Sequence, residues 1–287
     1  MSLSIHIDIE TCTRCRKCVR ICPAEIFIQE TPKSDVETQH ISSCIHCGHC
    51  VGVCPTSSIV HSDFPAEKIH PIHPEKFPTS EQLLLLIKSR RSNRAFSAKP
   101  VPAEKLDLIL EAAHRAPTGT NAQNVSFTLV TDPEKIQQVI GFTIDIFMEL
   151  GKKLSNPFLK PILKLIVPDA YAYLPHLEAL RRKYEMGQDP ILRKATALLL
   201  IHTPKKSQLG CQDANLAYQN GSLMAESLGI SQFYTGFLCI AMQQDKKNRI
   251  PNFLGIEGKV HAGMGLGVPS IHFENYIDRK EIDVRKL

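Results

Sequence analysis

Two runs of cysteine near the start of the chain constrain its fold more than any other feature. "CTRCRKCVRICP" begins at Cys12 and "CIHCGHCVGVCP" begins at Cys44, and each has the pattern C-x2-C-x2-C-x3-C-P. Every cysteine of the first run recurs 32 residues later, as Cys12 and Cys44 do, so the pattern is an internal duplication. The eight cysteines of the two runs are Cys12, Cys15, Cys18, Cys22, Cys44, Cys47, Cys50 and Cys54.

Three kinds of site compete for these cysteines. Disulfides are disfavoured because a chain of 287 residues needs no covalent staples and the expected compartment is reducing. Zinc sites place two ligands, a long gap and then two more. Here three cysteines are packed into one tight loop with a fourth just beyond, which is the spacing of bacterial proteins that bind two [4Fe–4S] clusters.

Residues 3–60 resemble a bacterial ferredoxin with two [4Fe–4S] clusters. The resemblance implies that cluster I is bound by Cys12, Cys15, Cys18 and Cys54, and cluster II by Cys44, Cys47, Cys50 and Cys22. The residue after the second cysteine of each run is often small in that family. Gly48 fits this pattern and Arg16 departs from it.

Basic residues crowd the first run: Arg14, Arg16, Lys17 and Arg20. They are interpreted as solvated charge that balances an anionic cluster, or as a dock for an acidic electron donor such as ferredoxin or flavodoxin. His46 and His49 lie between cluster II ligands, and they are expected to be exposed or to influence the cluster from outside its ligand shell.

Composition limits the remaining functions. The net charge is +5, there is no Trp, and no aromatic-rich basic stretch is present, so a nucleic-acid partner is not expected. The sequence shows neither a signal peptide nor an apolar run of about 18 residues, so no membrane partner is expected and the predicted location is cytoplasmic.

The organisation changes after the cysteine runs. We expect a ferredoxin domain over 1–62, a Pro-rich linker over 63–78 and a second domain over 79–287. His61, His70 and His73 are grouped with the linker and are not expected to bind metal. A capping box from Thr79 to Gln82 predicts the first helix of the second domain. Further helices are predicted from Pro102, from Pro133 and over 212–230, and strands from Val125, Ala195 and Lys259, which gives an α+β fold.

Two short motifs in the second domain carry chemistry. "RRSNRAF" begins at Arg90, and arginine is suited to bidentate contacts with phosphate. The alternative is a solvated helix end, where cations are favoured. "APTGTNAQN" begins at Ala116, and its small and amide residues can approach a planar ligand and bond to its edges.

These motifs, in this order, resemble the nitroreductase family, which binds FMN as a homodimer. The resemblance covers 79–287 and implies an α+β sandwich. It implies that Arg90, Arg91, Ser92 and Arg94 hold the phosphate, ribityl chain or pyrimidine edge. It also implies that Pro117, Thr118, Gly119, Asn121 and Gln123 lie over the flavin of the neighbouring subunit, that Gly236 lies near the reactive edge, and that Arg279 returns to the phosphate.

Some features depart from the family or offer other functions. Asn124 and Val125 stand where the family often has Pro-Trp. The Pro-rich helical stretch over 156–189 is interpreted as a lid or as simple packing. "GMGLG" from Gly263 lacks the spacing of a dinucleotide fingerprint. Cys211 and Cys239 are expected to be small buried hydrophobes rather than nucleophiles.

The two parts together predict an oxidoreductase. Electrons enter at the clusters and reach FMN, which reduces a small organic acceptor such as a nitroaromatic, a quinone or an activated alkene. The alternatives are a non-catalytic electron-transfer or flavin-carrier module, and reductive dehalogenation on the same fold. The sequence identifies no catalytic residue, native donor or proton donor.

Overall fold

The computed structural model describes residues 3–158, 160–166, 171 and 174–287. It divides into two compact units. The first comprises Met1–Phe77 together with Gly119–Ala122, and the second comprises Pro78–Thr118 and Gln123–Leu287. Within the described residues, no helix has the length and apolar character needed to cross a membrane.

The first unit is built from short elements around a small core. Two antiparallel strand pairs form, β1 (Ile5–Ile7) with β4 (Ile59–His61) and β2 (Phe27–Ile28) with β3 (Glu37–Thr38). Helices α1 (Lys17–Ile21) and α2 (His49–Val53) have only five residues each. Helices this short are marginal by themselves, so groups that bridge the cysteine loops contribute much of the stability of such a unit. Its buried core consists of Ile5, Ile26, Phe27, Val36, Cys50, Val51 and Ile59.

His61 does not belong with the linker histidines, and grouping it with them is wrong. It is the last residue of β4, pairs with Ile5 across the strands, and is 2% exposed. The linker that follows contains short 3₁₀ turns at Ala66–Lys68 and Pro74–Lys76, and its His70 and His73 are exposed. A further 3₁₀ turn, Ile41–Ser43, precedes the second cysteine run.

An antiparallel sheet of four strands forms the centre of the second unit. Its strand order is β5-β6-β8-β7. The bounds are Ser126–Val130 for β5, Ala197–Thr203 for β6, Ser231–Tyr234 for β7 and Lys259–Gly267 for β8. The strands predicted from Val125, Ala195 and Lys259 are confirmed. Strand β7 was not predicted, because its four residues include two polar ones, Ser231 and Gln232, both of which are buried.

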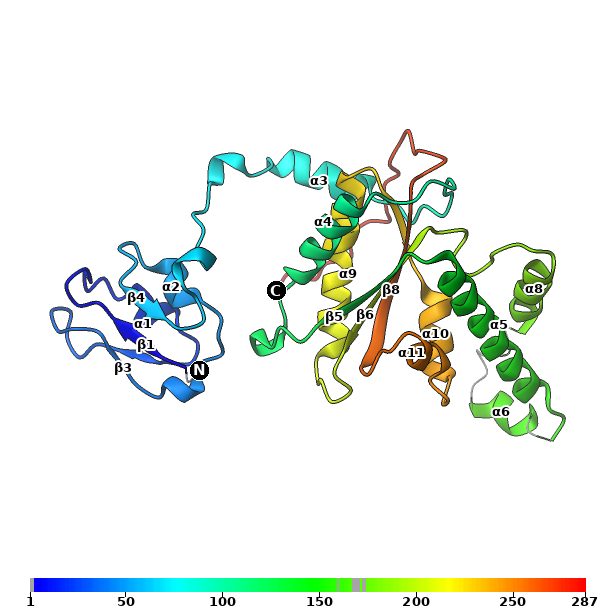
Figure 1. Ribbon diagram of the computed structural model, residues 1–287, viewed down its shortest axis with the longest axis horizontal. Coiled ribbons are helices and arrows are strands. Elements are labelled where there is room, and N and C mark those ends of the chain that lie inside the picture. The colour runs from blue at the N-terminus through cyan, green and yellow to red at the C-terminus, as the bar shows by residue number, and fades with distance from the viewer. Residues whose placement is uncertain (1–2, 159, 167–170, 172–173) are drawn as a thin grey trace. The chain divides into compact units, whose positions relative to one another are not determined.

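Helices cover both faces of this sheet (Figure 1). On one face α4 (Ala103–His114) and α9 (Gly210–Ser227) pack over Leu199 and Ile201 of β6. On the other face α5 (Pro133–Ser155) and α10 (Gly236–Gln244) pack over Leu198 and Leu200. Successive strand residues point to opposite faces, so the unbroken apolar run of β6 places side chains in both cores.

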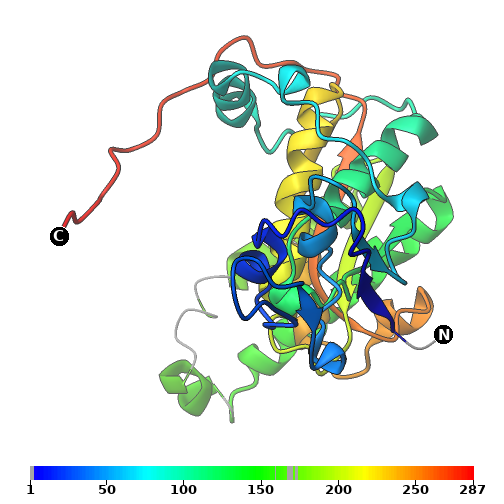
Figure 2. The same ribbon diagram turned by 90° about the vertical axis from the view of Figure 1, so that its left-hand side faces the viewer.

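The remaining helices lie at the margins of the second unit. They are α3 (Ser80–Ser89), α6 (Lys160–Ile166), α8 (Leu174–Glu185) and α11 (Arg249–Phe253). The predicted capping box is confirmed, because the Thr79 hydroxyl accepts from the Gln82 amide at 3.2 Å and Gln82 Oε1 accepts from the Thr79 amide at 3.0 Å. The interpretation of 156–189 as a lid partly involves residues 159, 167–170, 172 and 173, which lie outside the described residues. After β8 the chain runs to the C-terminus without regular structure, drawn in red in Figure 2.

Candidate functional site

The eight cysteines of the two runs line two separate cavities in the first unit. One cavity is lined by Cys12, Cys15, Cys18 and Cys54. The other is lined by Cys22, Cys44, Cys47 and Cys50. Each cavity therefore combines three cysteines of one run with the fourth cysteine of the other run, which is the division of ligands that the resemblance implies. Within the described residues, no group of three or more His, Cys, Asp or Glu is arranged around a single metal ion.

The backbone of both cysteine loops adopts the same unusual conformation. Arg14 and Arg16 have φ of 55° and 61°, and their duplicates His46 and Gly48 have φ of 54° and 71°. Left-handed residues alternating with ordinary ones turn successive N–H groups towards one concavity, a pattern that suits anionic iron–sulfur groups. In the second loop the His46 amide already donates to Cys44 Sγ at 3.4 Å. The chemistry of both loops thus fits a [4Fe–4S] cluster held by four thiolates.

The thiols differ in how readily they ionise. Burial raises the pKa of Cys50 to about 11, whereas the Lys17 backbone N–H lowers the pKa of Cys15 below its usual value. Cluster binding requires thiolates. Because burial favours the protonated thiol of Cys50, cluster binding at this residue must be accompanied by the release of its proton.

Polar side chains gather beside the cavity lined by Cys44. His61 Nε2 lies 3.6 Å from Cys44 Sγ, and the Asp63 amide donates to His61 Nδ1 at 3.1 Å. Burial lowers the pKa of His61. Asp63 also pairs with His46, and this hydrogen bond lowers the pKa of the Asp63 carboxyl. His46 and His49 are exposed, which is one of the expected outcomes for them.

The basic residues of the first loop are not equivalent. The Arg14 guanidinium contacts Asp35, with Nε 2.8 Å and NH2 2.6 Å from Oδ1. Arg16, Lys17 and Arg20 are exposed and have no ion pair with another described residue. These three therefore make up the free positive charge on this surface.

In the second unit, the "RRSNRAF" segment is anchored along β7 and the end of β8. Ser92 forms a bridge with Gln232 and Phe96 with Pro269. The Arg94 guanidinium lies over the Phe233 ring, 5.2 Å from its centroid, and donates to the Ser92 carbonyl at 3.2 Å. Ser92 and Arg94 therefore lie beside Gln232 and Phe233 of β7. Gly236, two residues after β7, begins α10.

Glycines of β8 make room for this segment. A Cβ at Gly265 would lie 2.6 Å from the Phe233 ring, and a Cβ at Gly267 would lie 2.5 Å from Phe96. A Cβ at Gly263 would meet the Thr235 hydroxyl. The "GMGLG" sequence therefore has a packing role, which accounts for its departure from the dinucleotide pattern.

Gly236 faces open space. No atom lies within 4 Å of a Cβ built there, although Thr235 before it and Leu238 after it are buried. A methyl side chain at this helix start would therefore meet no described atom within 4 Å apart from its chain neighbours and its own helix.

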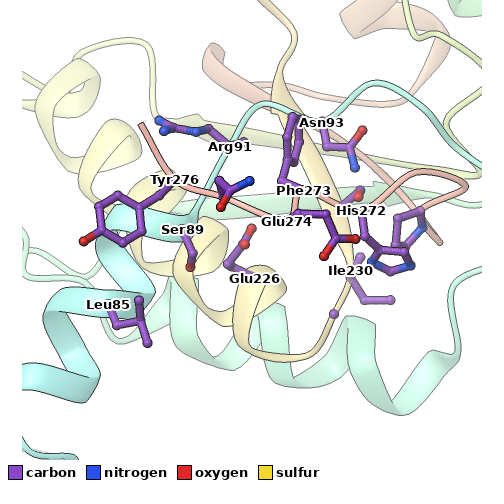
Figure 3. A pocket seen from close by; sticks show the side chains of 14 residues that line it. Leu85, Ser89, Arg91, Asn93, Glu226, Ile230, His272, Phe273, Glu274 and Tyr276 are labelled. Carbon is purple, nitrogen blue, oxygen red and sulfur yellow. The ribbon is translucent and has the colours of Figure 1, made fainter. Parts of the chain in front are cut away.

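Arg91 points away from its neighbours in the motif. It donates to the Ile277 carbonyl at 3.0 Å and lines a cavity of about 330 Å³ with Glu226, Phe273 and Tyr276 (Figure 3). Burial raises the pKa of Glu226, and the nearby Arg90 opposes this shift. Arg279 lies two residues beyond Ile277 in the exposed tail.

The loop predicted to cover a neighbouring flavin is split between the two units. The Thr118 hydroxyl accepts from the Gln123 amide at 2.9 Å, and the exposed Pro117 precedes it in the second unit. Gly119 and Asn121 belong to the first unit, where Asn121 Nδ2 donates to the carbonyls of Ile45 and His46 at 3.0 and 2.9 Å. No local pattern indicates this use of Asn121, because its partners are 75 or more residues away in the chain.

The two cysteines outside the runs differ. Cys239 is buried as expected, but Cys211 is exposed, so its prediction as a buried hydrophobe is wrong. Cys211 is the second residue of α9, on the helix's outer side, while Asp213 and Ala214 face inward.

Comparisons with known proteins match a separate family model to each of two parts of the chain. Residues 87–268 match the profile of the nitroreductase family, and residues 11–59 match that of the 4Fe–4S dicluster domain. A nitroreductase with bound FMN from Bacteroides fragilis aligns with a TM-score of 0.55 and 24% identity over 71% of this chain and 99% of its own. An iodotyrosine deiodinase bound to FMN and 3-iodo-L-tyrosine aligns with a TM-score of 0.50 and 21% identity over 71% of this chain and 97% of its own.

Among curated proteins, iodotyrosine deiodinase 1 of Rattus norvegicus is 38% identical over 79 residues. The match covers 26% of this chain and 28% of the relative. The chain thus spans less than half the length of the curated relatives it matches.

Proposed function

Because this chain belongs to the nitroreductase family, we propose that it is an FMN-dependent oxidoreductase supplied with electrons through two [4Fe–4S] clusters. The observation that carries the proposal is the pair of four-cysteine cavities in a chain whose second unit has the nitroreductase fold. FMN exchanges one or two electrons and [4Fe–4S] clusters exchange one at a time, so the pair can join a one-electron donor to a two-electron acceptor.

The second unit offers the groups that FMN requires. Arg90, Ser92 and Arg94 would hold its phosphate, ribityl chain or pyrimidine edge, with Arg279 as a further phosphate contact. The bridge from Ser92 to Gln232 fixes the backbone of this segment before any ligand arrives. The open space at Gly236 leaves room for a planar ring.

The acceptor is a small organic molecule, and two classes are supported. The family match favours nitroaromatics, quinones or activated alkenes. The similarity to iodotyrosine deiodinases favours reductive dehalogenation of an aromatic halide as the second candidate. Turnover of nitrobenzene, a benzoquinone and 3-iodo-L-tyrosine by the reduced protein would separate these classes. Failure to turn over any of them would favour the non-catalytic electron carrier.

The electron supply is tested with variants that disturb one cluster at a time. Anaerobic stopped-flow mixing with a reduced ferredoxin follows the loss of flavin absorbance. We expect Cys15→Ser and Cys47→Ser each to slow this phase strongly. Cys211→Ser is the matched control, because Cys211 is an exposed cysteine outside both cavities. If FMN is reduced equally fast in all three variants, the clusters do not supply it.

A homodimer is the assembly that this proposal requires. Helix α3 exposes the apolar side chains of Leu83, Leu84, Leu85 and Ile87, each 45–56% exposed. The tail after β8 adds Ile271, Phe273 and Ile277, each 58–71% exposed. Apolar side chains gathered in this way are typical of a contact surface, and a second copy is the occupant that we propose. A monomer in sedimentation that still retains FMN would contradict the dimer.

A further inference from the structure

The buried side chain beside cluster II is His61, and its surroundings fix how it is held. It pairs with Ile5 through β4, is 2% exposed, and packs against the Phe64 ring with centroids 4.7 Å apart. A ring held in this way by strand pairing and aromatic packing has little freedom to turn.

The hydrogen-bond partners determine which nitrogen of His61 carries the proton. The Asp63 backbone amide lies 3.1 Å from Nδ1 and can only donate, so Nδ1 is the acceptor. In a neutral ring the hydrogen is then on Nε2, which lies 3.6 Å from Cys44 Sγ. His61 therefore presents an N–H donor to one sulfur ligand of cluster II.

The duplicated half of the unit does not repeat this donor. The position 32 residues before His61 is Gln29, which is 7% exposed. Its Nε2 donates to the Ser34 carbonyl at 2.7 Å and not to a cysteine. On the cluster I side, Cys54 Sγ accepts from the Ser58 amide at 3.2 Å and lies 3.8 Å from the Thr56 hydroxyl. Both clusters thus have donors, but only cluster II faces a buried imidazole among the described residues.

We propose that His61 is a positioning residue that raises the reduction potential of cluster II through its N–H contact with Cys44 Sγ. Adding an electron makes the cluster and its thiolates more negative, so a donor directed at a ligand sulfur stabilises the reduced form. The proposal rests on the cluster assignment of the proposed function. It goes beyond that assignment, because it names a residue that gives the two clusters of a duplicated unit different reduction potentials.

The test is an anaerobic redox titration monitored by EPR on the reconstituted full chain. His61→Phe keeps an aromatic ring against Phe64 and removes the donor. We expect one of the two cluster midpoint potentials to fall by about 59 mV, which is a tenfold change in the equilibrium constant of a one-electron reduction. The midpoint potential of the other cluster should not change. His6→Phe is the control, since His6 is an exposed histidine of the paired strand β1.

Iron and sulfide content and the EPR signals of the oxidised and reduced forms are measured first. If the unaltered protein lacks two [4Fe–4S] clusters, the proposed function fails. If the clusters are present but neither midpoint moves in His61→Phe, or both move equally, the role of His61 is overturned.

A second variant covers the case in which His61→Phe does not retain its clusters. His61→Leu replaces the ring with an apolar side chain that has no donor, and we expect the same midpoint to fall. Loss of cluster II in both His61 variants, with His6→Phe intact, would show a structural requirement and overturn the proposed effect on the potential.

Discussion

The Tyr218 hydroxyl donates to Gln232 Oε1 at 2.6 Å in the buried part of the second unit. Gln232 is fully buried, and its Nε2 lies 3.4 Å from the Arg91 carbonyl while its backbone bridges to Ser92. A side chain of α9 thereby holds the strand residue that positions the arginine motif. The position of the candidate flavin contact Ser92 therefore depends on the buried hydrogen bond between Tyr218 and Gln232.

Removal of the Tyr218 hydroxyl tests this support. We expect Tyr218→Phe to destabilise the second unit by about 1–3 kcal/mol, because the buried Gln232 oxygen loses its donor. FMN should also be retained less well after gel filtration. Urea unfolding and flavin content give the two measurements. Tyr276→Phe, at a tyrosine that is 43% exposed, is the control. Unchanged unfolding in Tyr218→Phe would contradict the prediction.

The glycines of β8 provide a second test of the same framework. We expect Gly265→Ala to destabilise the second unit by about 1–3 kcal/mol, because the added Cβ would lie 2.6 Å from the buried Phe233 ring. Gly52→Ala, in helix α2 with no atom within 4 Å of the added Cβ, should not destabilise the protein. Thermal unfolding of both variants checks the contrast. Equal stability of Gly265→Ala and the unaltered protein would mean that the strand shifts at no cost.

The sequence predicted those features that depend on local patterns. The cysteine spacing indicated the kind of site, the resemblance to ferredoxins implied which four thiols share each cavity, and the capping box at Thr79 located the start of α3. The long apolar run of β6 and the periodic helices α4 and α5 were also evident. These signals depend on residues close together in the chain, where spacing determines geometry.

Features that depend on distant partners were missed. Strand β7 was overlooked because Gln232 is polar, and its burial is explained by hydrogen bonds with Tyr218 and Arg91, which are distant in the chain. His61 was grouped with His70 and His73 of the Pro-rich segment that follows it, whereas its pairing with Ile5 makes it part of β4. The Asn121 contacts with Ile45 and His46 join segments with no local relationship. The residue pattern within one segment cannot indicate which distant residues it contacts.

The left-handed backbone at Arg16 predicts a stabilising change. Arg16 has φ of 61°, which costs a non-glycine residue about 1–2 kcal/mol. We expect Arg16→Gly to stabilise the reconstituted first unit by about 1 kcal/mol, and the reciprocal Gly48→Ala to destabilise it, since the added Cβ also lies 3.2 Å from Phe64. Thermal unfolding under anaerobic conditions measures both. A destabilised Arg16→Gly would indicate that the arginine side chain contributes more than its backbone costs.

Glu226 predicts a dependence of stability on pH. Burial raises its pKa above the ordinary value of 4.5, so the folded state holds this proton more tightly than the unfolded state does. Its ionisation therefore destabilises the fold as pH rises from 4.5 through the folded pKa. We expect Glu226→Gln to be more stable than the unaltered protein at neutral pH, and this difference to vanish at pH below 4.5.

Unfolding midpoints measured across a pH series test the Glu226 prediction. Glu257→Gln, at an exposed glutamate, is the control for the loss of a surface carboxylate. A stability gain in Glu226→Gln that persists unchanged into acid would contradict the assignment, because it would then be independent of the carboxyl charge.

The free positive charges of the first cysteine loop predict the behaviour of the electron donor. Lys17 and Arg20 are exposed, whereas Arg14 is paired with Asp35. If an acidic donor docks here, opposite charges accelerate its approach and salt screens them. We expect the double variant Lys17→Glu and Arg20→Glu to lower the second-order rate of reduction by an acidic ferredoxin by about tenfold at low salt. Lys33→Glu, at an exposed lysine of the same unit, should have a smaller effect. The rates of the double variant and the unaltered protein should converge as salt increases, and a deficit that is constant with salt would show damage to cluster I instead of a lost docking surface.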